Sequence, residues 1–255
     1  MLGFKLVSRP ELDPKGRALM KMNGNTILIA GRRRSLLEEV TAAHAGMIAL
    51  ELDIEDPDSI ARLAEQVDRK FSNLNVLINN AGIMRNENLL SPAFSLDDAE
   101  ATVVTNLLGP IRLTTALLPG IVRQPQGAIL MVTSGLAYVP LSMTPTYCAT
   151  KAAIHSYTQS LRYQLKATSV QVIELIPPYV RTELMGARQV SDPVAMPLED
   201  FMAETMKLLA TSPQANEICV DRVKRLRFAE STGDYEAFYS QFNEAMNAAR
   251  QDERG

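Results

Sequence analysis

Short apolar runs alternate with segments of helical periodicity along most of this chain. Each run is bounded by polar or turn residues, and the segments between the runs repeat apolar side chains every three or four positions. This alternation is typical of βαβ units, so it predicts an α/β fold with a parallel sheet and helices on both faces. The predicted strands are residues 26–30, 47–54, 75–79, 127–133, 170–176 and 217–223, and the predicted helices are residues 35–44, 56–71, 96–123, 146–166, 198–211 and 232–250.

Two of the predicted helices carry local signals. The helix at 56–71 begins with Asp56 and Pro57, which are favourable at a helix cap and in a first turn. Inside the helix at 96–123, Pro110 stands four residues after Asn106 and has no N–H to offer the Asn106 carbonyl. The sequence therefore predicts a kink, which either serves packing alone or leaves an acceptor that holds a water near Lys151.

The stretch from Gly127 to Lys151 joins a strand, a loop and a helix, and it carries three polar side chains. Ser134 follows the buried strand, at the edge where open α/β sheets place ligands. Tyr147 and Lys151 are four residues apart in a helix and therefore project from one face.

These three groups favour proton transfer to a carbonyl oxygen. An ammonium beside a phenol favours the phenolate, so we expect Lys151 to lower the pKa of Tyr147. Such a tyrosine exchanges a proton near neutral pH, and Ser134 adds a hydrogen bond to the same oxygen. The alternative is an ordinary helix with a Tyr and a Lys one turn apart.

Polar residues also follow the other predicted strands. In residues 79–82 (NNAG), Gly82 lets the backbone approach a ligand closely, although a strand-end turn is the better explanation of the motif taken alone. Asp53 ends the second strand, where helix capping is the alternative. The arginines at 32–34 form either a clamp for a phosphate or a solvated cluster before a helix.

Composition narrows the classes of function. The 255 residues are 46% apolar, as in ordinary globular proteins. The net charge is −3 and the basic residues are spread out, so binding to nucleic acid or to an anionic membrane has no support. The apolar runs are short and interrupted, so no transmembrane span is expected.

The cysteines and histidines indicate a cellular compartment for the protein and do not suggest a metal-binding site. Cys148 and Cys219 indicate a reducing compartment without a disulfide framework. Residues 1–20 lack the apolar core and cleavage site of a signal peptide, so the chain is expected to be cytoplasmic. His44 and His155 have no carboxylate or cysteine at ligand spacing in the sequence, so no metal site is predicted.

No repeat or linker divides the chain, and one domain over residues 1–255 is predicted. The Met-rich, Pro-broken piece at 183–197 is expected to be mobile and, with the helix after it, to form a substrate flap over residues 183–211. The tail helix carries an aromatic stripe that should dock on the body, made of Tyr235, Phe238, Tyr239 and Phe242.

Taken together, these residues resemble the short-chain dehydrogenase/reductase family from Thr26 to about Arg227. The motifs come in the family's order: NNAG, an Asn in the following helix, Ser134 thirteen residues before Tyr147, and YCATK. The segment PPYVRT fits the family's strand-end contact to the nicotinamide half of the cofactor. The stretch VDRVKRLRFAE is similar to a branch named after a D-alanylation operon of teichoic acids.

The resemblance implies a Rossmann-type, doubly wound fold and hydride transfer between NADP(H) and a small carbonyl or alcohol. It makes Tyr147 the general acid/base, Lys151 its pKa modulator and ribose ligand, Ser134 the ligand of the substrate oxygen, and Asn106 the holder of a relay water. Arginines just past the second strand favour NADP(H), with NAD(H) as the alternative. The implied cofactor-binding residues are Arg32, Arg33, Asp53, Ile54, Asn80, Ala81, Gly82, Tyr147, Lys151, Pro177, Val180 and Thr182. The candidate substrate-pocket residues, which favour an apolar partner, are Ala137, Tyr138, Tyr179, Leu184 and Met185.

One element of the family is missing: the loop T-G-x-x-x-G-x-G that follows the first strand and binds the pyrophosphate at a helix N-terminus. We favour a deletion, in which residues 20–29 (MKMNGNTILI) join the first strand directly to the end of the second, and residues 1–19 replace the lost unit. In the alternative, residues 4–8 are the first strand and residues 16–19 are the remnant of the loop and helix start. Pro10 and Pro14 then lack the N–H donors of an anion site. Either alignment predicts an incomplete N-terminal βαβ unit and damaged pyrophosphate binding.

Two functions therefore compete. The first is an NADP-dependent oxidoreductase acting on a small molecule, expected to be a homodimer or homotetramer through the helices that contain Asn106 and Tyr147. The second is a non-catalytic scaffold or interaction protein of the same fold with impaired dinucleotide binding. The intact Asn, Ser, Tyr and Lys set favours the first, and the missing glycine loop favours the second.

Overall fold

The computed structural model describes residues 27–93 and 95–251 of the chain. The proposed replacement segment 1–19, the join at 20–26 and both alignments of the glycine loop lie outside these residues. The described strands are β1 (Ile27–Gly31), β2 (Met47–Glu51), β3 (Val76–Asn79), β4 (Gly127–Val132), β5 (Val170–Ile176) and β6 (Glu217–Cys219). The α-helices are α1 (Arg34–Ala43), α2 (Pro57–Lys70), α3 (Asp97–Val103), α4 (Gly109–Val122), α5 (Pro145–Gln164), α6 (Ala187–Ser191), α7 (Leu198–Thr211), α8 (Lys224–Arg227) and α9 (Tyr235–Gln251), with a π-helix at Val104–Leu108 and 3-10 turns at Gly135–Ala137, Asp221–Val223 and Ala229–Thr232.

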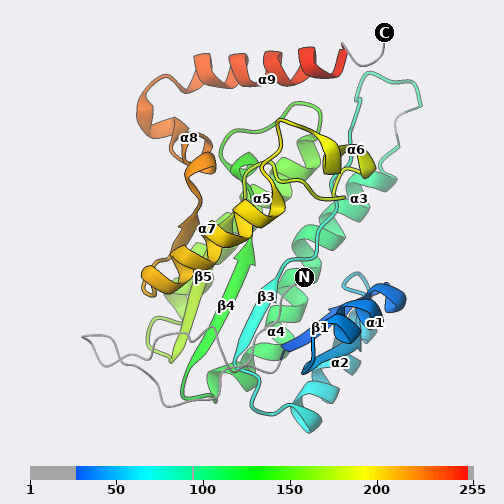
Figure 1. The fold of residues 1–255 in the computed structure, drawn as a ribbon, viewed down its shortest axis with the longest axis vertical. Helices are drawn as coiled ribbons and strands as arrows, with labels where there is room; N and C mark the ends of the chain where they lie inside the picture. The colour runs from blue at the N-terminus through cyan, green and yellow to red at the C-terminus, as the bar shows by residue number, and fades with distance from the viewer. Residues whose placement is uncertain (1–26, 94, 252–255) are drawn as a thin grey trace.

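The strands are parallel, and the described residues form two sheets rather than one. β1 pairs with β2, and β3, β4, β5 and β6 form a second sheet in that order. In Figure 1, β1, α1 and α2 lie to one side of β3. The predicted α/β architecture with parallel strands is confirmed, and among the described residues β1 and β3 are not paired with each other. The predicted N-terminal βαβ unit extends beyond the described residues, so its incompleteness stays a prediction.

Helices cover both faces of the four-stranded sheet, as the alternation of elements predicts. Side chains of a strand alternate between the faces, so Ile129 of β4 packs in the cluster with α2, α4 and α5. The neighbouring Leu130 packs on the opposite face against Leu209 of α7. Figure 1 shows α9 lying across the end of the molecule toward which β4 points.

The capping of α2 follows the sequence signal. The side chain of Asp56 accepts a hydrogen bond from the Asp58 amide at 2.9 Å, and Pro57 occupies the first helical position. Other boundaries differ. β2 ends at Glu51 and β6 at Cys219, both before the predicted ends, because the chain leaves the sheet at the turns that follow.

The long predicted helix is interrupted at the expected place. Between α3 and α4 the chain forms a π-helix, in which the Gly109 amide donates to the Val104 carbonyl five residues earlier. Pro110 follows directly and has no N–H for a regular turn, so the wider turn accommodates it. The interruption is confirmed, whereas a free acceptor at the Asn106 carbonyl stays a prediction.

Gly109 is needed where this helix crosses the end of β2. A methyl group there would lie 2.6 Å from Ile54 Cγ1 and 2.8 Å from the Ile54 carbonyl oxygen. We expect Gly109→Ala to destabilise the protein by about 1–3 kcal/mol, because backbone must move. Gly120→Ala, in the same helix, meets only an Arg123 guanidinium nitrogen at 3.8 Å and should stabilise by about 0.5–1 kcal/mol. Urea unfolding of both variants checks this, and equal free energies of unfolding would contradict the crowding at Ile54.

The stretch Asp97–Val122 is also long and apolar enough, by length and composition alone, to cross a membrane. The expectation of only short apolar runs overlooked it. Within the described fold, α3 and the π-helix pack against α5, and α4 packs against α2. Its apolar side chains therefore have partners in the core, as in many buried helices.

Candidate functional site

Ser134 and Tyr147 meet just past the end of β4. The Ser134 hydroxyl accepts a hydrogen bond from the Leu136 amide at 3.1 Å, which fixes its direction, and it lies near enough to the Tyr147 phenol to act on that group's pKa. Tyr147 lies in the first turn of α5 and is 5% exposed. Burial raises the pKa of Tyr147 to about 12, and the Ser134 hydrogen bond offsets only part of this.

Lys151 lies one turn further along α5 and is also buried. Its Nζ donates to the Val132 carbonyl at 2.8 Å and lies 5.6 Å from the centroid of the Tyr147 ring. Burial lowers the pKa of Lys151 to about 8. The expectation that Lys151 lowers the pKa of Tyr147 is wrong for this structure, because burial of the phenol outweighs any such effect.

Asn106 connects the loop after β3 to this helix. Its Oδ1 accepts from the Ile83 amide and its Nδ2 donates to the Ile83 carbonyl, both at 2.8 Å. Nδ2 also lies 3.3 Å from the Thr150 hydroxyl. A methyl group on Gly82 would lie 3.4 Å from Asn106 Oδ1 and 3.8 Å from Lys151 Nζ, so Gly82 passes close to both groups. Asn106 and Lys151 therefore share one small region at the end of β3.

The implied cofactor residues line the carboxyl ends of the strands. Asn80 and Ala81 follow β3 and are exposed. The Pro177 carbonyl, after β5, accepts from the Gly135 amide at 3.0 Å and so ties the ends of β4 and β5 together. Val180 forms a β-bridge with Met196, and Thr182 turns the chain by accepting from the Leu184 amide.

The arginines at 32–34 do not act as one group. Arg32 Nη1 lies 3.1 Å from Glu55 Oε1 and 3.9 Å from Asp53 Oδ1, so it reaches past the end of β2 and is paired with carboxylates there. Arg33 is exposed at the start of α1. Arg34 pairs within its own helix, with Glu38 at 2.9 Å. Ile54, between the two acids, is buried.

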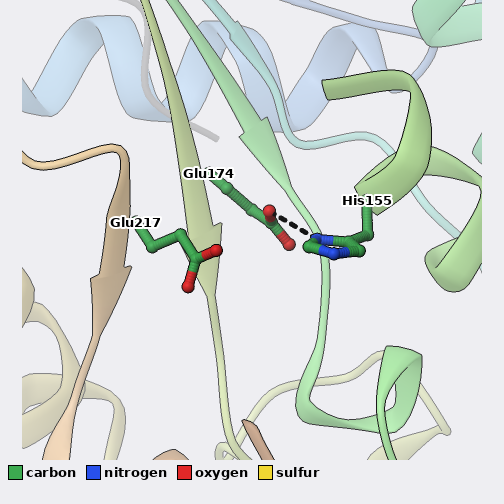
Figure 2. A group of neighbouring side chains, drawn as sticks. All are labelled: His155, Glu174 and Glu217. Atoms are coloured by element: carbon green, nitrogen blue, oxygen red, sulfur yellow. Dashed lines mark hydrogen bonds and ion pairs between the residues drawn. The ribbon is translucent and has the colours of Figure 1, made fainter. Parts of the chain in front are cut away.

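A buried carboxylate that was not predicted supports the Ser134 loop. Glu174 of β5 is fully buried and accepts from the hydroxyls of Thr133 at 2.8 Å and Tyr138 at 2.9 Å. His155 Nδ1 lies 2.8 Å from its other oxygen, as Figure 2 shows. Burial and the nearby Glu174 raise the pKa of Tyr138, which therefore stays a donor. An acidic residue inside the apolar run VQVIELI was the available signal in the sequence.

The fold also gives His155 neighbours that its sequence spacing did not show. One ligand atom from each of His155, Glu174 and Glu217 lies within 4.8 Å of the others (Figure 2). Glu217, however, binds Arg227 through two hydrogen bonds of 2.8 and 2.9 Å, which hold the pKa of Glu217 below its usual value. His155 therefore has carboxylate neighbours in space that sequence spacing does not show, and they form a hydrogen-bonded network with Tyr138.

The stretch VDRVKRLRFAE packs directly beneath the same loop. A methyl group on Gly135 would lie 2.6 Å from Leu226 Cδ1 and 2.8 Å from Val223 Cγ2. The Arg227 guanidinium lies 4.5 Å from the centroid of the Tyr138 ring. Gly135 and Tyr138, both in this loop, therefore pack against the C-terminal part of the chain.

An apolar wall encloses Tyr147. It includes Leu184 and Met185 from the candidate pocket, whereas Tyr138 packs in another cluster and the Tyr179 hydroxyl donates to Asp192 at 2.9 Å. The predicted mobile piece at 183–197 is held by Gln189, whose side chain bonds the Met185 amide and the Val180 carbonyl. The wall around Tyr147 and Cys148 comprises Met84, Leu136, Leu141, Met143, Leu184, Met185, Phe242 and Met246.

Helix α9 contributes to this wall, so the predicted docking of its aromatic stripe is confirmed for two of its members. Phe242 lies in the wall, and the Tyr235 hydroxyl donates to the Tyr138 carbonyl at 3.3 Å. Asn243, one residue further, accepts from the Ser142 amide at 2.7 Å and donates to the Pro140 carbonyl at 3.1 Å. The helix is therefore fastened to the loop between β4 and α5.

Comparisons with known proteins agree with this geometry. The family model for short chain dehydrogenases matches residues 16–192. The uncharacterized oxidoreductase DltE of Bacillus subtilis (strain 168) is 34% identical over 88% of this chain and 89% of its own.

Two solved structures share the fold. A short chain dehydrogenase from Burkholderia cenocepacia in complex with NADP has a TM-score of 0.70 at 25% identity, covering 83% of this chain and 84% of that one. The closed form of a serine dehydrogenase complexed with NADP+ has a TM-score of 0.66 at 26% identity, covering 75% and 82%.

Proposed function

Because the chain belongs to the short-chain dehydrogenase family, in the branch of DltE, we propose that it interconverts a small carbonyl compound and its alcohol by hydride transfer. The observation that carries this proposal is the contact between Ser134 and Tyr147, one helical turn from the buried ammonium of Lys151. Such groups can supply a hydrogen bond and a proton to a carbonyl oxygen as the carbonyl is reduced to an alcohol.

In the proposed reaction, the substrate oxygen sits between the Ser134 hydroxyl and the Tyr147 phenol. A reduced nicotinamide, when bound, supplies the hydride to the carbonyl carbon. Tyr147 donates its proton to the oxygen, and Ser134 stabilises the charge that develops there. Because burial raises its pKa, Tyr147 carries its proton at neutral pH and can donate it to the substrate oxygen.

The described residues fit one half of the dinucleotide. Gly82 leaves room beside Asn106 and Lys151, and Asn80 and Ala81 are exposed at the same edge. Tyr147 and Lys151 would hold the ribose, and Pro177, Val180 and Thr182 would border the nicotinamide. At the other end, Arg33 would meet a 2′-phosphate together with Arg32, once Arg32 exchanges its carboxylate partners for the ligand.

Several finer expectations belong to this proposal. We favour NADP(H) because of the two arginines and because two structural relatives were solved with NADP. A cytoplasmic location is consistent with Cys148 and Cys219, which are free thiols in the described chain. A homodimer or homotetramer, a single domain and a substrate flap over residues 183–211 are proposed on the same resemblance.

The rival function is a non-catalytic scaffold of the same fold. The described residues contain no T-G-x-x-x-G-x-G turn between a strand and a helix, and Arg32 already has acidic partners. Loss of the N–H donors that hold a pyrophosphate would weaken the binding of any dinucleotide.

Calorimetric titration of the full chain with NADPH and with NADH separates the two functions. We expect NADPH to bind at least about tenfold more tightly than NADH, which is about 1.4 kcal/mol. Arg33→Ala should remove this preference, because it removes a phosphate partner. Arg34→Ala is the matched control and should retain it, since Arg34 is paired with Glu38. Absence of binding at millimolar cofactor would favour the scaffold.

A further inference from the structure

The first turn of α5 needs hydrogen-bond partners from outside the helix. The first N–H groups of a helix lack acceptors within it, and the side chain at the N-cap usually supplies one. Thr144 occupies that position without making a capping hydrogen bond, and its hydroxyl lies 3.6 Å from Cys148 Sγ instead. Pro145 has no N–H, so Thr146 carries the first N–H that needs an acceptor. A group that accepts from Thr146 therefore also fixes the turn that carries Tyr147.

Glu87, in the loop between β3 and α3, supplies this acceptor. Its Oε1 accepts from the Thr146 amide at 3.0 Å, and its Oε2 accepts from the Thr146 hydroxyl at 2.8 Å. The Glu87 amide also donates to the Met143 carbonyl at 2.8 Å, just before the helix. A carboxylate is favourable at this end of a helix because the helix dipole places positive charge there. Glu87 thus holds the chain on both sides of Thr144.

The same loop is fixed at its other end beside the proposed site. The side chain of Asn106 makes two hydrogen bonds of 2.8 Å with the backbone of Ile83. Met84, the next residue, is buried in the wall around Tyr147. The loop is therefore attached both to Asn106 and to α5, and Glu87 forms the attachment to α5.

We propose that Glu87 is a positioning residue for Tyr147, an inference that rests on the proposed function. Its carboxylate holds the first turn of α5 and thereby keeps the phenol at the place where the substrate oxygen would bind. Both carboxylate oxygens are occupied by Thr146, so Glu87 acts through the helix and not on the reacting atoms. Such a role has a large effect, because misplacing a reacting group by about 1 Å can lower a rate about 100-fold.

Steady-state carbonyl reduction by three variants tests this role. Glu87→Ala should lower kcat by about 10–100-fold. Its KM for the carbonyl substrate should change less than about threefold, because the phenol must be aligned only in the transition state. Glu87→Asp keeps the charge but is one methylene shorter, so it should not reach both Thr146 groups and should lose activity similarly. Glu87→Gln keeps the length and both hydrogen bonds, since the Thr146 hydroxyl can accept from the amide, and its kcat should stay within about threefold of wild type.

Asp56→Ala is the control for the loss of a helix cap alone. It removes the carboxylate that accepts from the Asp58 amide at the start of α2. Both Asp56→Ala and Glu87→Ala should lower the melting temperature by about 2–4 °C, but Asp56→Ala should retain wild-type kcat. Wild-type kcat in Glu87→Ala, or equal losses of kcat in Glu87→Ala and either Glu87→Gln or Asp56→Ala, would overturn the positioning role and leave the proposed function intact.

Nuclear magnetic resonance of the full chain with isotope-labelled tyrosine rings gives a measurement that does not depend on activity. The Tyr147 signal, identified by its absence in Tyr147→Phe, should shift or broaden in Glu87→Ala and keep its wild-type position in Glu87→Gln. If the wild type reduces no carbonyl compound, the proposed function fails and this signal alone decides the placement of the phenol by Glu87. A Tyr147 signal that Glu87→Ala leaves unmoved would overturn that placement. If Glu87→Ala does not fold, Glu87→Asp replaces it in both measurements.

Discussion

Tyr147→Phe is expected to lower kcat for carbonyl reduction by about 10²–10⁴-fold, the usual contribution of a general acid. The substitution removes only the phenolic hydroxyl, which lies near Ser134, and keeps the ring in its apolar wall. The fold should therefore be retained. Steady-state kinetics with a panel of small aldehydes and ketones, alongside circular dichroism and thermal unfolding, measures both effects.

The control for this variant lies on the same helix. Tyr163 is 70% exposed near the end of α5, so Tyr163→Phe should retain wild-type turnover. Unchanged reduction by Tyr147→Phe would remove Tyr147 from its proposed role. Loss of turnover in both variants would instead indicate a general effect on α5.

The buried ammonium of Lys151 should make folding stability depend on pH. Burial lowers its pKa from 10.5 to about 8 in the folded protein. Between these values the unfolded chain binds the proton more strongly, so the Lys151 contribution to stability rises with pH. Relative to Lys151→Met, the wild type should gain about 2–3 kcal/mol in free energy of unfolding from pH 7 to pH 10.

Urea unfolding of both proteins across this pH range measures the difference. Tyr147 and Cys219, whose pKa values are also raised, are present in both proteins, so their contributions largely cancel. Lys166→Met is a matched control, because Lys166 is an exposed lysine beside the Tyr163 ring, and it should show no such gain. A constant difference between the wild type and Lys151→Met would show that the ammonium is not buried.

The sequence predicts those parts of the fold that depend on neighbouring residues. Apolar periodicity locates α2 and α7 to within a residue or so, and Asp56 caps α2 as its position indicates. The pairing of the described strands, in which β1 pairs with β2 and β3 pairs with β4, could not be predicted in this way. Whether two strands pair depends on what lies between them, and the periodicity of a strand does not identify its neighbour.

In the candidate site, too, the features that depend on neighbouring residues could be predicted, and those that depend on distant segments could not. The spacing of Tyr147 and Lys151 and the strand end before Ser134 predict one cluster, and the structure brings these residues together with Asn106 and Gly82. The pKa of Tyr147 could not be predicted, because burial depends on an apolar wall drawn from distant segments. The carboxylates beside His155 were missed for the same reason, since they come from β5 and β6.

The contact between Gly135 and the pair Val223 and Leu226 links two parts of the chain that are far apart in sequence. The stretch VDRVKRLRFAE, on which the resemblance to the branch rests, is also the stretch that packs against the loop carrying Ser134. Substitutions in one part therefore alter the steric requirements of the other. A chimera that takes its C-terminal segment from another branch would place different side chains against Gly135. The loop that carries Ser134 and the C-terminal stretch should therefore be exchanged together.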